Sequence, residues 1–160
     1  MTPDDYKVGQ QEYESLTSEL EKICELKTEI AEEGERAERR LAALEQAFPS
    51  LLAAYYLEEK SERDIESHRK QMVSARETIA ECPLALKGLE RPYLQATNRR
   101  GYVLKYVIRP WEAVEGLKDK LRSAGGGREY RDQLVKDYRS AAAQIGQTPD
   151  AESFLATLGK

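Results

Sequence analysis

Residues 13–55 read YESLTSELEKICELKTEIAEEGERAERRLAALEQAFPSLLAAY, and core-type positions recur in them at alternating spacings of three and four. These positions are Tyr13, Leu16, Leu20, Ile23, Lys27, Ile30, Gly34, Ala37, Leu41, Leu44, Phe48, Leu51 and Tyr55. This heptad pattern predicts a long coiled-coil helix. Another helix, of this chain or of a partner, has to cover such a stripe. We therefore expect a protein that works by making contacts.

The first predicted helix begins after Thr2, a suitable N-cap residue, and continues to about Leu57. Residues 57–60 form the predicted turn. Ser61 and Asp64 follow at the spacing of a capping box, with Asp in the place of the usual Glu. The sequence therefore predicts that a second helix begins at this point.

A second heptad seam lies in the predicted second helix, which we expect to end near Glu90. Its positions are Ile65, His68, Met72, Ala75, Ile79, Cys82, Leu86 and Leu89. Two heptad helices joined by about four residues predict an antiparallel coiled-coil hairpin over residues 1–90, with Gly34 and Glu35 opposite Pro83 and Cys82. In architecture alone, such a hairpin resembles the stalk proteins of bacterial export ATPases, and this resemblance leaves residues 91–160 unexplained.

The expected hairpin leaves part of the first seam uncovered, because a second helix that ends near Glu90 cannot reach the N-terminal turns of the first. The uncovered seam positions include Tyr13, Leu16, Leu20 and Ile23. An exposed apolar stripe of this size usually marks an interface. We therefore expect these four side chains to bind a protein partner, either a second copy in a dimer or a heteropartner.

Residues 91–124 form the second predicted region, a β-hairpin followed by a helix. Two strand-like segments, 93–97 and 102–108, flank the four-residue turn Asn98–Gly101. A helix is then predicted from Pro110 to about Ser123. The alternative is a helix from Pro92 onward, since Val103, Val107, Val114 and Leu121 also fit helical spacing.

The third predicted region, residues 125–160, holds the C-terminal helices after a glycine linker. Gly125–Gly127 form the linker, a helix is predicted over 128–145, and a short last helix begins at Thr148. The expected fold class is mainly α, a long helical hairpin followed by a small α or α+β region.

Charge is divided unevenly along the chain, of which 34% is charged. Residues 1–82 carry 11 Lys and Arg against 20 Asp and Glu, whereas residues 83–160 carry 14 against 9. These opposite fields favour self-association or an acidic partner for the C-terminal half. With no apolar run long enough to cross a bilayer, we expect a soluble, cytoplasmic protein with no membrane partner.

One basic and aromatic cluster favours an alternative function, a nucleic-acid-binding accessory protein. Its candidate contact residues are Arg99, Arg100, Tyr102, Lys105, Arg109 and Trp111. Arginines at a hairpin tip can reach phosphates, and Tyr and Trp rings can stack on bases. The competing interpretation is that the aromatic rings form a small core and that the cations are solvated or paired with acidic side chains.

No catalytic, cofactor-binding or metal-binding constellation is visible in the sequence. His68 is the one histidine, and no second His or Cys follows it at a ligand spacing. Gly125–Gly127 lack the Gly-Lys-Ser/Thr ending of a phosphate loop. We therefore expect a non-enzymatic coiled-coil adaptor or assembly protein.

Overall fold

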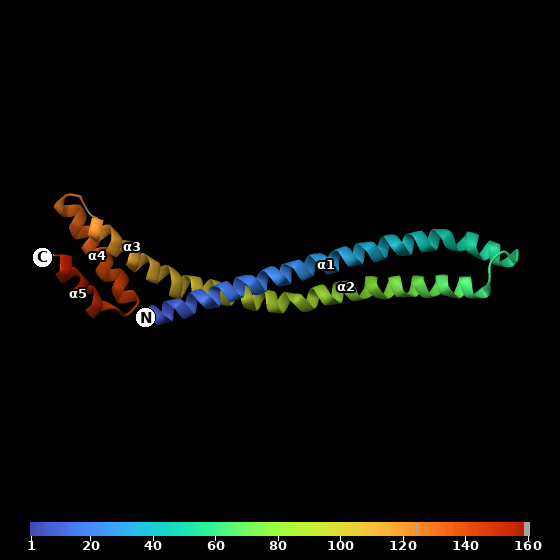
Figure 1. The fold of residues 1–160 in the computed structure, drawn as a ribbon, viewed down its shortest axis with the longest axis horizontal. Coiled ribbons are helices and arrows are strands. Elements are labelled where there is room, and N and C mark those ends of the chain that lie inside the picture. The colour runs from blue at the N-terminus through green and yellow to red at the C-terminus, as the bar shows by residue number, and fades with distance from the viewer. Residues whose placement is uncertain (124, 159–160) are drawn as a thin grey trace. The chain divides into compact units, whose positions relative to one another are not determined.

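The computed structural model describes residues 1–123 and 125–158, which are almost entirely helical and include no strand. The elements are α1 (Pro3–Tyr56), α2 (Glu62–Val103), the π-helix η1 (Leu104–Ile108), α3 (Arg109–Ser123), α4 (Arg128–Gln144) and α5 (Thr148–Leu158) (Figure 1). The expected mainly α class is confirmed. The chain divides into a hairpin unit, Glu19–Gln95, and a terminal unit, Met1–Ser18 with Ala96–Lys160.

Both long helices begin with the caps that the sequence predicts. At the start of α1, the Asp5 amide donates to Thr2 Oγ1 (3.1 Å) and the Thr2 amide donates to Asp5 Oδ2 (2.6 Å). At the start of α2, the Ser61 amide donates to Asp64 Oδ2 (2.9 Å), and the Asp64 amide donates to Ser61 Oγ (3.3 Å). These bonds favour the charged carboxylate, so the backbone amides of Thr2 and Ser61 lower the pKa of Asp5 and Asp64.

In the hairpin unit, α1 and α2 meet through contacts that run in opposite order along the two helices. Near the turn, His68 Nε2 lies 2.7 Å from the Leu44 carbonyl oxygen. Farther from it, a Cβ added at Gly34 would lie 3.4 Å from Cys82 Cβ. Gly34 therefore lies beside Cys82, within one residue of the predicted placement of Gly34 and Glu35 opposite Pro83 and Cys82, and the missing side chain at residue 34 leaves room for Cys82.

The predicted β-hairpin over residues 92–108 is wrong, because α2 continues through the proposed turn to Val103 and η1 follows it. The predicted end of the second helix near Glu90 is wrong for the same reason. Burial shows why the helical alternative prevails: Ala96 and Val103 are buried at a seven-residue separation, as one face of a helix requires. The predicted region boundary after residue 90 consequently falls inside α2.

Pro110 lies in the first turn of α3, directly after the π-helix. Proline has no backbone N–H, and inside an α-helix its ring clashes with the carbonyl four residues earlier, here that of Tyr106. A local change to wider π geometry, in which the Arg109 amide donates to the Leu104 carbonyl, separates these groups without ending the helix.

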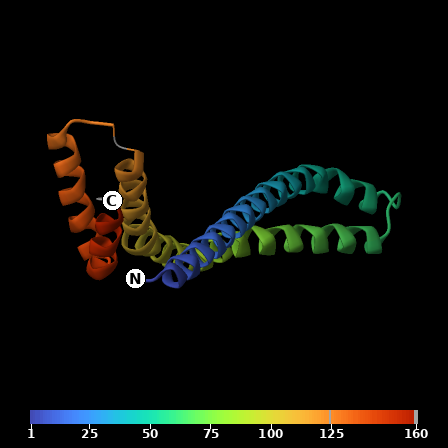
Figure 2. The ribbon, with the colours of Figure 1, turned by 60° about the vertical axis from the view of Figure 1, so that its left-hand side comes forward.

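The core of the terminal unit is formed by α3, α4 and α5, and α4 lies beside both other helices (Figure 2). Its buried members are Val114, Leu121, Leu134, Tyr138, Ala142, Ile145 and Ala151. The predicted helices from Pro110, Arg128 and Thr148 are confirmed to within a residue or two at their ends. The link between α4 and α5 contains Gly146 at φ 72°, a conformation that glycine adopts without strain.

The N-terminal residues pack against the same core. The Met1 amino group donates to the Ile145 carbonyl (2.7 Å), and Gln147 Nε2 donates to the Met1 carbonyl (2.8 Å). About two turns farther on, Gly9 is buried, and a Cβ added there would lie 2.6 Å from Val107 Cγ1. The start of α1 therefore contacts η1 more closely than a larger residue at position 9 would permit.

Replacing Gly101 with alanine should stabilise the protein by about 0.5 to 1 kcal/mol, because glycine inside a helix costs about this much relative to alanine. Nothing lies within 4 Å of a Cβ added at Gly101, so the methyl group meets no obstacle. A higher denaturant midpoint at unchanged slope is the expected result. A β-hairpin turn with positive φ at this glycine would instead make the substitution destabilising.

Two further observations concern cysteines and membranes. Cys24 is exposed and Cys82 is buried, and both thiols are free. Among the described helices, none has the length and apolar character needed to cross a bilayer.

Candidate partner-binding face

The four seam residues expected at a partner interface are largely covered by the chain itself. Leu20 and Ile23, in the hairpin unit, are only 5% and 7% exposed. Tyr13 and Leu16, in the terminal unit, are half-buried, and the Arg100 guanidinium lies 5.9 Å from the centroid of the Tyr13 ring. The uncovered stripe on which this prediction rested is therefore not present.

The exposed aromatic surface lies instead in the terminal unit, at the junction of α2, η1 and α3. Tyr102 and Tyr106 are each 52% exposed, and their ring centroids are 4.8 Å apart. Arg99, Lys105 and Arg109 are exposed beside them in the same helical run. We call these five residues, Arg99, Tyr102, Lys105, Tyr106 and Arg109, the aromatic-basic face.

Two cations of this face lie over its tyrosine rings. Lys105 Nζ is 4.9 Å from the centroid of the Tyr106 ring, and the Arg99 guanidinium is 5.4 Å from that of Tyr102. Exposed contacts of this kind contribute about 0.5 to 1 kcal/mol each. They hold the charged groups close to the aromatic surface, so a ligand that covers the rings also meets the cations.

Arg99 has a second partner, since its guanidinium binds Glu12 through both carboxylate oxygens, at 2.5 and 3.1 Å. This hydrogen bonding, together with the charge of the carboxylate, raises the pKa of Arg99. A two-point ion pair of this kind fixes the direction of the guanidinium, even though solvent screening makes its contribution to stability small. No local sequence pattern points to Glu12, because it lies 87 positions from Arg99.

Two predicted nucleic-acid contacts lie outside this face. Trp111 is half-buried and stacks on Tyr6, with ring centroids 5.5 Å apart at 16°. Burial, and then the neighbouring Glu112 carboxylate, raise the pKa of Tyr6. Arg100 packs over Tyr13, as described above. The structure thus brings together Arg99, Tyr102, Lys105 and Arg109, and it uses Arg100 and Trp111 in contacts with α1.

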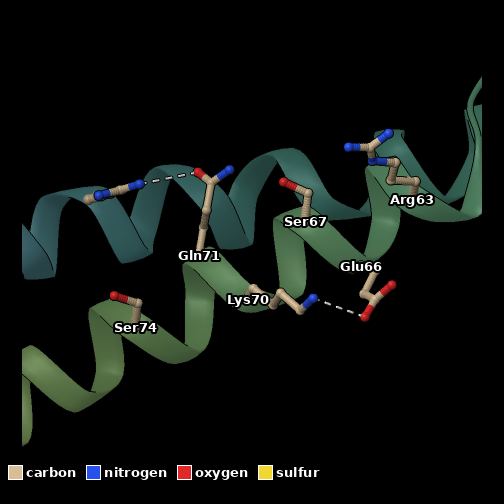
Figure 3. Close-up of a pocket in the computed structure, with 7 residues that line it drawn as sticks. Arg63, Glu66, Ser67, Lys70, Gln71 and Ser74 are labelled. Carbon is tan, nitrogen blue, oxygen red and sulfur yellow. Dashed lines mark hydrogen bonds and ion pairs between the residues drawn. The ribbon is translucent and has the colours of Figure 1, made fainter.

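A separate polar groove of about 440 Å³ runs along α2 in the hairpin unit (Figure 3). It is lined by Arg40, Arg63, Glu66, Ser67, Lys70, Gln71 and Ser74. Lys70 pairs with Glu66 at 3.1 Å, and Arg40 donates to Gln71 at 3.3 Å. These are the mutual contacts of an exposed, solvated helix surface, and they leave the groove without an unpartnered buried polar group.

The described residues contain no cluster of three His, Cys, Asp or Glu side chains suited to a metal ion. His68 is engaged with the Leu44 carbonyl and stacks on Phe48, with ring centroids 5.4 Å apart. The aromatic-basic face is the candidate functional site, and what it offers is binding surface.

No protein family, no curated protein and no solved structure matches this chain.

Proposed function

We propose that this chain is a non-enzymatic coiled-coil adaptor or assembly protein that docks protein partners through the aromatic-basic face. In this proposal, α1 and α2 form an antiparallel coiled-coil hairpin, and the terminal unit presents the docking face. The observation that carries the proposal is the pair Tyr102 and Tyr106, two large side chains left half in solvent with cations around them.

The composition of the face supports protein docking. Tyrosine and arginine are enriched among the residues that dominate protein interfaces, where tyrosine buries a large surface and loses few rotatable bonds. About half of each ring remains available to a partner. The location at a π-helix adds support, because π-helical turns occur frequently at functional sites.

Replacing both Tyr102 and Tyr106 with alanine should abolish partner capture while leaving the fold intact. Truncation of two central aromatic anchors costs about 2 kcal/mol or more of binding free energy each, which is at least a 30-fold loss of affinity per residue. The measurement is affinity capture from an extract of the source cells, read by quantitative mass spectrometry.

Tyr130→Ala is the matched control, since Tyr130 is a comparably exposed tyrosine of the same unit, on α4. Treating the extract with nucleases before capture separates direct protein binding from bridging by nucleic acid. Proteins retained by the wild type and Tyr130→Ala after nuclease treatment, and lost with the double variant, support the proposal. Equal capture by all three chains would contradict it.

The alternative function, nucleic-acid binding, is favoured by the same exposed tyrosines beside Lys105 and Arg109. Three observations weigh against it: Arg99 is bound to Glu12, Arg100 and Trp111 contact α1, and the chain has a net charge of −4. Titration into labelled single- and double-stranded oligonucleotides at about 50 mM salt, where screening is weak, should show no binding. Binding that the double variant loses would establish the alternative.

A further inference from the structure

We infer that the aromatic-basic face docks onto the acidic stripe of a second copy of this chain, formed by Glu21, Glu25, Glu29 and Glu32 of α1. This inference rests on the proposed function and names the partner. The stripe lies in the hairpin unit and the face in the terminal unit, so every copy carries one of each.

The acidic stripe is a continuous feature of α1. Its four carboxylates are spaced by four, four and three residues, which places them on one side of a helix. A shallow groove of about 370 Å³ follows the stripe. Its lining contains no basic residue and consists of Cys24, Glu25, Thr28, Glu29 and Glu32. Among the ion pairs of the described residues, none uses a carboxylate of this stripe.

The two surfaces are similar in length and opposite in charge. At 1.5 Å per residue, Glu21 and Glu32 are separated by about 16 Å along α1, and Arg99 and Arg109 by about 15 Å along their helical run. Because Arg99 is held by Glu12, helices crossing at a shallow angle can bring two cations, Lys105 and Arg109, against the carboxylates of the stripe, with the Tyr102 and Tyr106 rings beside them. Thr28 and Cys24 provide the small side chains that large rings require opposite them.

Charge complementarity also sets the expected strength. Exposed ion pairs are individually weak and are screened by salt, and the aromatic area is modest. The dimer should therefore be in the micromolar to millimolar range, form at raised concentration and dissociate as salt increases. A dimer held together by a dry apolar interface would instead be insensitive to salt.

Sedimentation velocity of charge-reversed variants tests this pairing. Wild-type chain from about 10 to 500 µM should show a rising dimer fraction at about 50 mM salt and at least a tenfold weaker association at about 500 mM salt. The basic-face variant Lys105→Glu/Arg109→Glu and the acidic-stripe variant Glu25→Lys/Glu29→Lys should each associate at least tenfold more weakly. Mixed in equal amounts, they should associate again, because each surface then meets its opposite.

Arg128→Glu/Lys136→Glu is the matched control, since it reverses two exposed charges of the same unit on α4 and should leave the dimer unchanged. Circular dichroism confirms that each variant is folded. A wild type that stays monomeric at about 500 µM and low salt would overturn the inference. Two reversed variants that fail to associate when mixed would overturn it as well.

Cys24 gives a second readout, because it is exposed within the acidic stripe while Cys82 is buried. Under mild oxidation, an Asn98→Cys variant, which places an exposed thiol beside the face and keeps both tyrosines, should form a covalent dimer through Cys24 of the other copy, and adding Cys24→Ser should reduce its yield severalfold. Tyr130→Cys, placed away from the face, should form little of it. Equal yields from positions 98 and 130 would overturn the inference. The proposed function is tested separately: it fails if the wild type and the double Tyr102→Ala/Tyr106→Ala variant capture the same proteins from extracts.

Discussion

Replacing Tyr138 with alanine should lower the free energy of unfolding by about 3 to 5 kcal/mol, the usual cost of removing a fully buried aromatic side chain. Tyr138 is 1% exposed at the centre of the terminal-unit core, and its ring packs edge-on against Phe154 with centroids 5.4 Å apart. Alanine would leave a cavity among α3, α4 and α5. Chemical denaturation followed by circular dichroism measures the loss.

Tyr130→Ala is the control for this substitution, because it removes the same atoms from the same helix at a side chain that is 53% exposed. Its effect should stay within about 0.5 kcal/mol. Similar effects at the two positions would mean that α4 presents a different face to the core. That result would contradict the packing of the terminal unit.

Gly9→Ala should destabilise the protein by about 1 to 3 kcal/mol, the cost of overpacking a closely packed contact. The added methyl group would lie 2.6 Å from Val107 Cγ1, a distance at which the Val107 side chain or one of the two helices has to shift. On propensity alone the substitution would be stabilising, because alanine is the better helix former. The sign of the change therefore reports whether α1 and η1 meet at this glycine.

Gly101→Ala is the matched comparison, since it makes the same chemical change at a helical glycine with open space around it. The two substitutions should shift the denaturant midpoint in opposite directions. A stabilising Gly9→Ala would contradict the close approach of the start of α1 to η1.

Helix beginnings and the turn at residues 57–60 were predictable from sequence because their causes are local. Thr2 with Asp5 and Ser61 with Asp64 satisfy the backbone donors of their own first turns, within three residues of one another. The facing of Gly34 and Cys82 was also predictable, because two seams and one turn position fix the register.

The path of the chain from residue 90 to 110 was not predictable in the same way. Tyr102, Tyr106 and the apolar residues between them fit an alternating pattern as well as a helical one, and Asn98–Gly101 resembles a turn. What decides the outcome is the burial of Ala96 and Val103 on one helical face, which short-range propensity does not contain.

The sequence predicted most of the residues of the candidate site, but the predicted arrangement of these residues was wrong. Arg99, Tyr102, Lys105 and Arg109 were named from sequence as members of one cluster at and beside the tip of a β-hairpin, and they lie instead along a continuous helical run. Trp111 and Arg100 were assigned to the same surface, but Tyr6 and Tyr13 occupy them. Both partners come from the other end of the chain, so no local pattern could have separated these two residues from the rest.

Site-specific photo-crosslinking in the source cells tests the central claim most directly. A photoreactive phenylalanine analogue is placed at position 106 in one chain and at position 130 in another, and covalent adducts are identified after irradiation. Docking through the aromatic-basic face predicts protein adducts from position 106, with the chain itself among them, and few from position 130. Adducts that are equally frequent at both positions, or that consist of nucleic acid, would contradict it.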